Sequence, residues 1–178
     1  NENLVVVNIS GNAIAMPWVK EVPAIVQAWY LGTEAGNTIA SVLVGDVNPS
    51  GKLPFTFPAS LEDIGAHKLG EYPGVLRTDG SNILDEKYNE GIFVGYRWAD
   101  KEKTKPLFPF GHGLSYTTFK YGKAVADKKV MGQDEVLTVT VPVTNAGSRE
   151  GSEVVQLYIS DLKSSLSRPV KELKGFSK

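Results

Sequence analysis

The two histidines are the side chains of this sequence that could act as ordinary bases near neutral pH. His112 lies between two glycines, in Phe110-Gly111-His112-Gly113. This setting suits a base or a substrate donor on a tight loop, and it also suits a turn residue at a domain surface or seam. We favour the turn residue, because no matching nucleophile or carboxylate accompanies His112. His67 lies in a polar loop without a partner, and no H-x-x-x-H spacing typical of a zinc site exists.

The carboxylates are numerous enough to supply the acid/base pair of a glycosidase, which needs two carboxyl groups about 5–9 Å apart. The candidates from the first half of the chain are Glu34, Asp46, Glu62, Asp63, Glu71, Asp79, Asp85, Glu86 and Glu90. Glu90 is the best single candidate, because it precedes Gly91 and the aromatic residues Phe93, Tyr96 and Trp98. A structural ion pair or a turn cap remains the favoured role for Glu90. The sequence alone does not show which two of the nine carboxylates could form a catalytic pair.

The aromatic side chains invite the hypothesis of sugar stacking, but most of them stand in apolar strings, so core packing is the expectation. These residues are Trp18, Trp29, Tyr30, Trp98, Phe108, Phe110, Tyr116 and Phe119. No P-loop, dinucleotide-binding fingerprint or G-x-S-x-G motif is present, and we expect no cofactor and no metal.

Composition excludes several other classes of function. The 178 residues contain 19 Lys and Arg against 20 Asp and Glu, a formal charge of −1, which provides no general attraction to nucleic acid or to an anionic membrane. The absence of cysteine excludes disulfides, thiolate metal sites and cysteine nucleophiles. No apolar run approaches the roughly 18 residues that a membrane span needs. The start Asn1-Glu2-Asn3-Leu4, without Met, leads us to expect a piece of a longer polypeptide.

The elements of the first half alternate between strand and helix. Residues 4–9 and 24–29 are short apolar runs of the kind found in parallel strands buried on both faces. Residues 33–45 have helical periodicity, with Thr33 as the expected N-cap and Gly45 in the left-handed position after the last turn. The prolines of residues 53–58 allow only an edge or irregular strand, and residues 61–90 read as a long loop. Residues 92–98 form either a strand or the start of a short helix.

The second half, from about Tyr116, alternates with period two and is broken by turn signals such as Asn145-Ala146-Gly147-Ser148. We expect four strands, near 118–126, 136–143, 153–160 and 169–176. This spacing is typical of a β-sandwich, of which about seven strands are usual. The predicted fold class is therefore α/β followed by all-β: a partial α/β sandwich domain with an incomplete β-sandwich.

Six strings of residues, in the same order and spacing, resemble glycoside hydrolase family 3, and together they cover nearly the whole chain. They lie at 22–46 (with Gln27-Ala28-Trp29-Tyr30), 48–54 (Asn48-Pro49-Ser50-Gly51-Lys52-Leu53-Pro54), 90–97 (Glu90-Gly91-Ile92-Phe93-Val94-Gly95-Tyr96-Arg97), 108–117, 151–158 and 168–176.

The resemblance implies the C-terminal portion of a retaining, exo-acting β-glucosidase-like enzyme. Residues 1–115 would end its α/β sandwich domain, and residues 116–178 would begin a fibronectin type III-like domain. The nucleophile Asp and the acid/base Glu of the family lie in motifs upstream of anything resembling Asn1, so no catalytic residue is assigned here, Glu90 included. The implied partners are a β-glucoside or oligosaccharide and the remaining polypeptide, with a homo-oligomer left open. The resemblance favours a periplasmic or secreted location.

Two hypotheses of a different class remain open: a stand-alone carbohydrate-binding module and a purely structural β-sandwich module. A binding module would need exposed aromatic side chains, and Tyr158 is the only aromatic residue of the best sandwich strand.

The chain between the two domains is expected to bend sharply at Gly111 and Gly113, with Gly113 at a positive φ. Pro106 and Pro109 stiffen the segment that leads to this bend.

Overall fold

Two parallel strands open the chain, as the β-branched runs predict. The computed structural model describes all of residues 1–178. Strand β1 (Val5–Asn8) pairs in parallel with β2 (Ala24–Gln27), with Val5 opposite Ala24 and Asn8 opposite Gln27. The expectation that both strands are buried on two faces is wrong for these 178 residues, because Val5 is 44% exposed and Ala24 is also exposed.

Helix α1 (Ala35–Leu43) follows β2 and is amphipathic, but it is shorter than its periodicity predicts. The assignment of Thr33 as N-cap is wrong: a 3-10 turn over Gly32–Glu34 precedes the helix, and no side chain caps its first turn. Gly45 has a φ of +86°, so its predicted left-handed conformation after the helix is confirmed.

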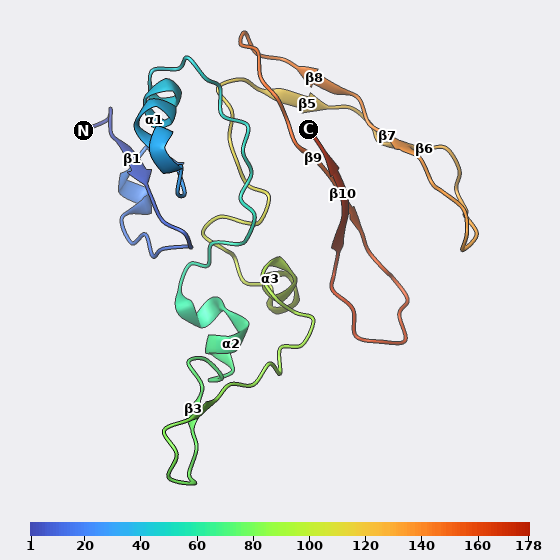
Figure 1. The fold of residues 1–178 in the computed structure, drawn as a ribbon. Coiled ribbons are helices and arrows are strands. Elements are labelled where there is room, and N and C mark those ends of the chain that lie inside the picture. The colour runs from blue at the N-terminus through green and yellow to red at the C-terminus, as the bar shows by residue number, and fades with distance from the viewer.

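Two segments that are far apart in the sequence lie side by side in the middle of the molecule (Figure 1). The Leu53 N–H donates to the His112 carbonyl at 2.8 Å, and the Gly111 N–H donates to the Leu53 carbonyl at 2.8 Å. Phe57 forms an isolated antiparallel bridge with Phe108. The proline-rich stretch 53–58 is thus an irregular extended segment, as expected. We call residues 51–57 and 107–113 the paired connectors.

Between the paired connectors lies an excursion that the sequence reads as a long loop and that contains several short elements. These are a 3-10 turn (Leu61–Asp63), helix α2 (Gly65–Lys68), strands β3 (Val75–Leu76) and β4 (Leu84–Asp85), and helix α3 (Tyr96–Glu102). The strands form an antiparallel hairpin that projects from the rest of the excursion (Figure 1). The ambiguity over residues 92–98 resolves as the start of helix α3.

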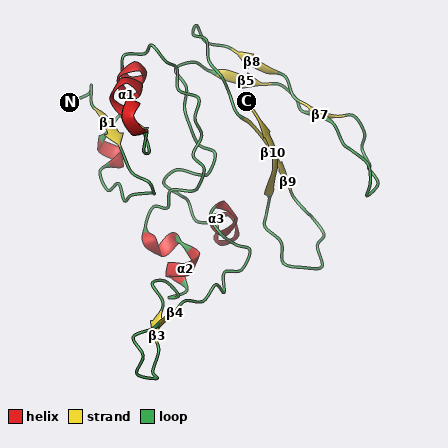
Figure 2. Cartoon of the chain, viewed as in Figure 1, coloured by secondary structure: helices red, strands yellow, loops and turns green.

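The second half is built of antiparallel ribbons, as its period of two predicts (Figure 2). Strand β5 (Phe119–Tyr121) pairs with β8 (Val143–Asn145), β6 (Val125–Ala126) pairs with β7 (Val139–Thr140), and β9 (Val155–Ile159) pairs with β10 (Glu172–Ser177). The two expected strands near 118–126 and 136–143 are each divided in two. Pro142, which has no N–H to donate, lies between β7 and β8, so the ladder is interrupted there.

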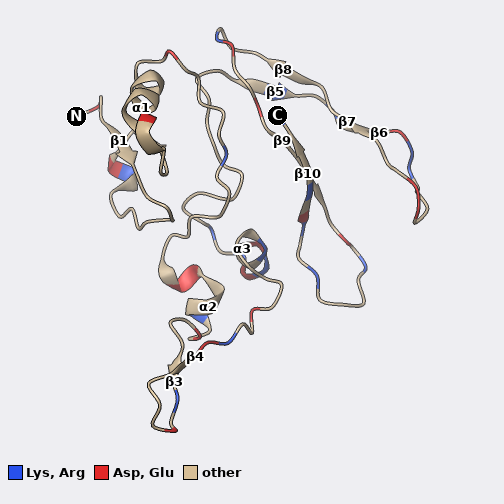
Figure 3. Ribbon diagram, viewed as in Figure 1, with Lys and Arg blue, Asp and Glu red and all other residues tan.

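The buried core is small and lies around the connectors and the excursion. Ten of the 178 residues are buried, and Phe57, at 1% exposure, is the most deeply buried large side chain. Phe93 and Trp98 are buried in the excursion, whereas the ribbons expose many apolar side chains, including Val136, Leu162 and Phe176. Positively charged Lys and Arg and negatively charged Asp and Glu are interspersed along the whole chain and form no extended segment of one sign (Figure 3).

Residues 1–178 expressed alone are expected to associate and to melt without a cooperative transition. Apolar side chains exposed on ribbons with unpaired edges favour association over a unique monomer, and Val130 and Leu162 are 84% and 90% exposed. Size-exclusion chromatography and a thermal melt test the expectation. A monodisperse monomer with one sharp transition would contradict it.

Candidate functional site

The structure does not bring the candidate acids and bases together into one catalytic cluster. His112 lies in the connector and His67 lies on α2, where its ring contacts Tyr72 edge-on at 5.0 Å. No group of three or more His, Cys, Asp or Glu side chains could hold a metal ion. No helix is long and apolar enough to cross a membrane.

Glu90 is buried, with 9% exposure, in the neighbourhood of α2 and α3. An added Cβ on Gly65 would lie 3.3 Å from the Glu90 Cβ and 3.0 Å from the Trp98 ring, so the glycine permits this close packing. The favoured ion pair is absent, because Glu90 Oε2 has no hydrogen-bond partner and no cation pairs with it. The Glu90 carbonyl accepts from the Phe93 N–H at 3.1 Å, so its backbone takes part in the turn before α3.

Most of the other carboxylates have local partners. Glu34 accepts from the Asn37 side chain, Asp63 from Ser60, Asp79 from Ser81, Asp85 from Arg77, and Glu71 from Asn89. The hydrogen bonds from Ser81 lower the pKa of Asp79, and a backbone hydrogen bond followed by that from Ser60 lowers the pKa of Glu62. Both of these shifts favour the ionised form, so neither Asp79 nor Glu62 has the raised pKa of a general acid.

A set of hydrogen bonds, ion pairs and ring contacts joins the α/β half to the ribbon half, and we call it the seam. Asn48 is its central residue: Oδ1 accepts from the Ser115 hydroxyl at 2.9 Å and from the Tyr116 N–H at 2.7 Å, while Nδ2 donates to the Glu150 carbonyl at 2.8 Å. The Tyr116 hydroxyl donates to the Val42 carbonyl of α1 at 2.9 Å. The Asn48 side chain thus connects the turn after α1, in which it lies, to the segment that enters the ribbons and to the loop that contains Glu150.

A second group of seam contacts is ionic and largely shielded from water. Lys52 Nζ lies 3.1 Å from Glu153 Oε1 and donates to the Gly113 carbonyl at 2.7 Å; the Lys52 and Glu153 side chains are 16% and 15% exposed. The Tyr121 hydroxyl donates to Glu153 at 3.1 Å, and burial, followed by this hydrogen bond, raises the pKa of Tyr121. Arg149 donates to the Gly45 carbonyl, and its guanidinium lies over the Tyr116 ring at 5.5 Å.

Helix α3 makes the third group of seam contacts, against β10. The Leu173 N–H donates to the Tyr96 hydroxyl at 2.9 Å, and Arg97 pairs with Glu172 at 3.1 Å. The Tyr96 ring stacks on Phe110 at 5.1 Å and meets Tyr158 edge-on at 5.9 Å. Tyr158 therefore packs at the seam and does not itself form an exposed platform on which a sugar ring could stack.

Part of the aromatic strings forms a core along the paired connectors, as expected, but the expectation is wrong for Tyr30 and Tyr116, which are 77% and 43% exposed. Trp29 meets Phe55 and Phe57 edge-on at 5.3 and 6.1 Å, and Phe57 meets Phe108 edge-on at 6.4 Å. Trp29 adopts a φ of +56°, a left-handed conformation that is costly for a non-glycine residue, and these ring contacts accompany it. The row ends at His112, whose ring stacks on Phe108 at 5.3 Å.

The expected bend around His112 is present, but the two glycines have different roles. Gly111 has a φ of +78°, whereas Gly113 does not lie in the left-handed region, so that part of the expectation is wrong. A Cβ on Gly113 would overlap the Gly51 carbonyl oxygen. Gly113 is therefore required by the close approach of the paired connectors and not by its backbone angles. His112 is a turn residue, as favoured, and its N–H donates to the Pro109 carbonyl at 3.0 Å.

Burial lowers the pKa of His112, and the positive charge of Lys52 lowers it further. The unfolded chain therefore takes up a proton near the ordinary pKa of about 6.5 before the folded chain does. Stability is expected to fall as the pH decreases from about 6.5 to the lower folded-state pKa, with no further loss from this group below it. In the full-length enzyme that carries this sequence, His112→Gln should shrink the difference between the melting temperatures at pH 7.5 and pH 5.0. His67→Gln is the matched control, and an unchanged difference in His112→Gln would contradict the prediction.

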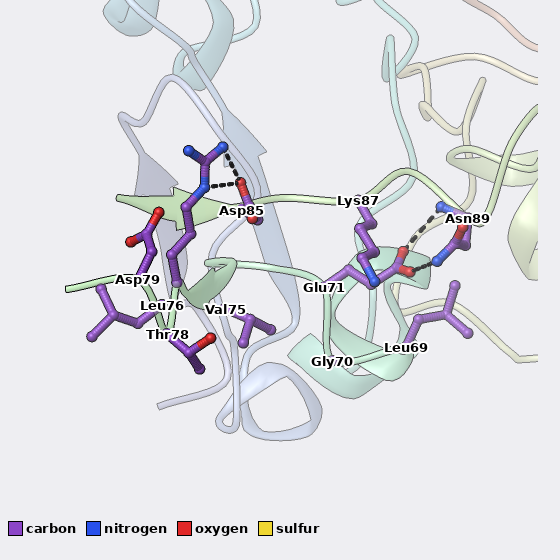
Figure 4. A pocket seen from close by; sticks show the side chains of 11 residues that line it. Leu69, Gly70, Glu71, Val75, Leu76, Thr78, Asp79, Asp85, Lys87 and Asn89 are labelled. Carbon is purple, nitrogen blue, oxygen red and sulfur yellow. Dashed lines mark hydrogen bonds and ion pairs between the residues drawn. The ribbon is translucent and has the colours of Figure 1, made fainter. Parts of the chain in front are cut away.

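A concavity of ≈ 500 Å³ is the other marked feature, and it lies beside the hairpin of β3 and β4. Figure 4 shows Asp85 and Asp79 on one side of it and Glu71 and Asn89 on the other. Glu71 is 8% exposed and accepts from the Asn89 backbone N–H at 3.1 Å and from its side-chain amide. Sequence reasoning included Glu71 among the carboxylates but gave no sign of its burial.

Comparison with known proteins gives the class to which this arrangement belongs. Residues 1–116 match the glycosyl hydrolase family 3 C-terminal domain, and residues 153–178 match the fibronectin type III-like domain. The chain therefore belongs to glycoside hydrolase family 3, as its six strings indicate, and its fold is the expected α/β part followed by a fibronectin type III-like part.

The similar proteins are β-glucosidases. Beta-glucosidase BoGH3A of Bacteroides ovatus is 53% identical over 100% of this chain and 23% of its own length. Thermostable beta-glucosidase B of Acetivibrio thermocellus is 47% identical over 99% of this chain and 22% of its own. Among solved structures, the β-glucosidase DesR of Streptomyces venezuelae in complex with D-glucose has a TM-score of 0.87 at 42% identity, covering 99% of this chain and 22% of its own. The chain thus spans less than a quarter of the length of these relatives.

Proposed function

We propose that this chain is the C-terminal part of a retaining, exo-acting β-glucosidase that hydrolyses terminal β-D-glycosidic bonds, and that it serves as scaffold for the active site. The observation that carries the proposal is the 53% identity to a β-glucosidase over the whole chain. The candidate carboxylates are scattered and most of them have local partners, which supports the scaffold role. In this proposal the nucleophile Asp and the acid/base Glu belong to polypeptide outside these 178 residues.

The substrate of the proposed enzyme is a β-glucoside or an oligosaccharide with a terminal glucosyl unit. Relatives from Thermotoga neapolitana and Kluyveromyces marxianus have been solved in complex with glucose, at 37% and 46% identity to this chain. A retaining mechanism would need two carboxyl groups about 5–5.5 Å apart, one as nucleophile and one as acid and base.

We place the boundary between the two domains at residues 115 and 116. The family match that ends at residue 116 supports this boundary. The hydrogen bonds from Ser115 and Tyr116 to the Asn48 side chain, where the chain enters the ribbons, support it as well. The seam contacts make the two domains one rigid scaffold in this proposal, because they distribute hydrogen bonds and ion pairs over three separate contact groups.

The test compares residues 1–178 with the full-length enzyme that carries this sequence, using p-nitrophenyl β-D-glucopyranoside. The full-length enzyme should release nitrophenolate, and the isolated chain should not. Failure of the full-length enzyme on β-glucosides would contradict the proposed reaction. Turnover by the isolated chain that disappears in Glu90→Gln would contradict the scaffold role and give Glu90 the part of the acid.

A further inference from the structure

The concavity beside β3 and β4, which we call the hairpin concavity, has the size of a small-molecule site. Its ≈ 500 Å³ falls within the range of about 300–1,000 Å³ that ligand pockets occupy. One wall is formed by the hairpin and the other by the Glu71–Asn89 pair (Figure 4). The chemistry of these walls decides which class of ligand could fill it.

The Glu71 wall presents a carboxylate held in a fixed orientation. Two donors of Asn89, the backbone N–H and the side-chain amide, bind the two oxygens of Glu71. An ionised carboxylate offers about four acceptor positions, so further acceptor positions remain for a ligand. Because Glu71 is 8% exposed, its geometry is set before any ligand arrives.

The hairpin wall presents donors and an acceptor together. Arg77 donates from Nε to Asp85 Oδ1 at 2.8 Å, and its Nη2 lies 2.7 Å from the same oxygen. A guanidinium has five N–H donors, so others remain available, and Asp85 Oδ2 remains as an acceptor. The register of the hairpin, with Val75 opposite Asp85, places this ion pair at its base.

Apolar side chains complete the lining and the net charge is low. Leu69 and Val75 line the concavity and are 45% and 64% exposed, so they offer C–H surface to a ligand. The charged lining residues are three carboxylates and two cations, a balance of −1: Glu71, Asp79, Asp85, Arg77 and Lys87. Acceptors, donors and apolar patches in nearly neutral balance are what a ring with many hydroxyl groups requires.

Other ligand classes fit less well. An anion such as phosphate would face three carboxylates, and Arg77 is already paired with Asp85. A divalent cation would need clustered oxygen ligands, and no group of three acidic or histidine side chains is close enough to hold one. A purely apolar ligand would leave the polar groups of both walls desolvated and without hydrogen-bond partners, which is unfavourable.

We propose that the hairpin concavity binds one neutral, polyhydroxylated ring, a hexose unit of a saccharide. Its hydroxyl groups lie between the Glu71 carboxylate and the Arg77–Asp85 pair, and a C–H face lies on Val75. The site requires no catalytic carboxylate, so it goes beyond the proposed hydrolysis and is independent of it. Because the concavity is open and contains no aromatic platform, the expected dissociation constant is about millimolar.

The experiment is equilibrium dialysis of the full-length enzyme against radiolabelled D-glucose, with the glucosidase rate measured on the same samples. The key variant is Val75→Trp, whose indole fills the concavity from an exposed position without removing a hydrogen bond. Leu84→Trp is the matched control, because Leu84 lies on the same hairpin, is 52% exposed, and does not line the concavity.

The wild type and Leu84→Trp should bind two glucose molecules per chain, and Val75→Trp one, with at least a tenfold loss of affinity at the second site. The rate on p-nitrophenyl glucoside at low substrate concentration should be the same in all three. Equal binding of glucose by the wild type and Val75→Trp, whether one or two molecules per chain, would overturn the proposal. An inactive enzyme that still loses one bound glucose in Val75→Trp would overturn the proposed hydrolysis and support this site.

Discussion

Gly113→Ala should destabilise the full-length enzyme by about 2–4 kcal/mol, through the seam. The new Cβ would lie well inside van der Waals contact with the Gly51 carbonyl oxygen, which belongs to backbone that is fixed by the Leu53–His112 pairing. Relief requires separating the paired connectors, which would also draw Lys52 away from the Gly113 carbonyl.

The matched control for this substitution is Gly51→Ala, on the other side of the same contact. A Cβ on Gly51 has no heavy atom within 4 Å, so its cost should stay within about 0.5 kcal/mol. Urea-unfolding midpoints, followed by tryptophan fluorescence, measure the difference. Equal midpoints for the two variants would show that the connectors can separate at no cost, contrary to the role we give Gly113.

Lys52→Met should also be strongly destabilising, by about 2–4 kcal/mol, because it leaves a largely buried carboxylate without its cation. Glu153 is 15% exposed and would retain only the Tyr121 hydroxyl as a side-chain partner. Loss of the Lys52 hydrogen bond to the Gly113 carbonyl adds to this effect.

The comparison pair is Lys68–Glu102, whose nitrogen and oxygen lie 2.6 Å apart but whose side chains are 45% and 27% exposed. Lys68→Met should lower the urea midpoint much less than Lys52→Met, because water screens this pair. The double variant Lys52→Met with Glu153→Leu should recover part of the stability lost in the single variant, since no unpaired charge remains. If the single and double variants have the same urea midpoint, the burial of an unpaired charge is not the cause.

Local features of the fold could be predicted from the sequence, because local interactions determine them. The β-branched runs predict β1 and β2, the helical period predicts α1, and Gly45 supplies the left-handed turn that ends it. The start of α1 could not be predicted, because Thr33 has the residue type of an N-cap but is already part of a 3-10 turn. The form of residues 92–98 depends on the buried Trp98, a tertiary contact that periodicity over seven residues does not reveal.

The seam lay beyond sequence reasoning for a different reason. Asn48 has the appearance of a turn residue in Asn48-Pro49-Ser50-Gly51, yet its partners lie 67, 68 and 102 residues away. Lys52 and Glu153 are separated by 101 residues, and each stands in an ordinary polar context. The resemblance to family 3 predicted that the two domains meet at about residue 115, but only the fold identifies which side chains join them.

The paired connectors have a topological consequence. Because residues 51–57 are hydrogen-bonded to residues 107–113, the excursion between them begins and ends at the same place and forms a closed loop. The entropy of closing such a loop grows only with the logarithm of its length, so lengthening the excursion adds little to the cost of holding its base together. The hairpin can therefore vary in size and sequence among relatives while the two domains keep the same mutual orientation. The enzyme's geometry and the surface that the hairpin presents are, in this sense, free to evolve separately.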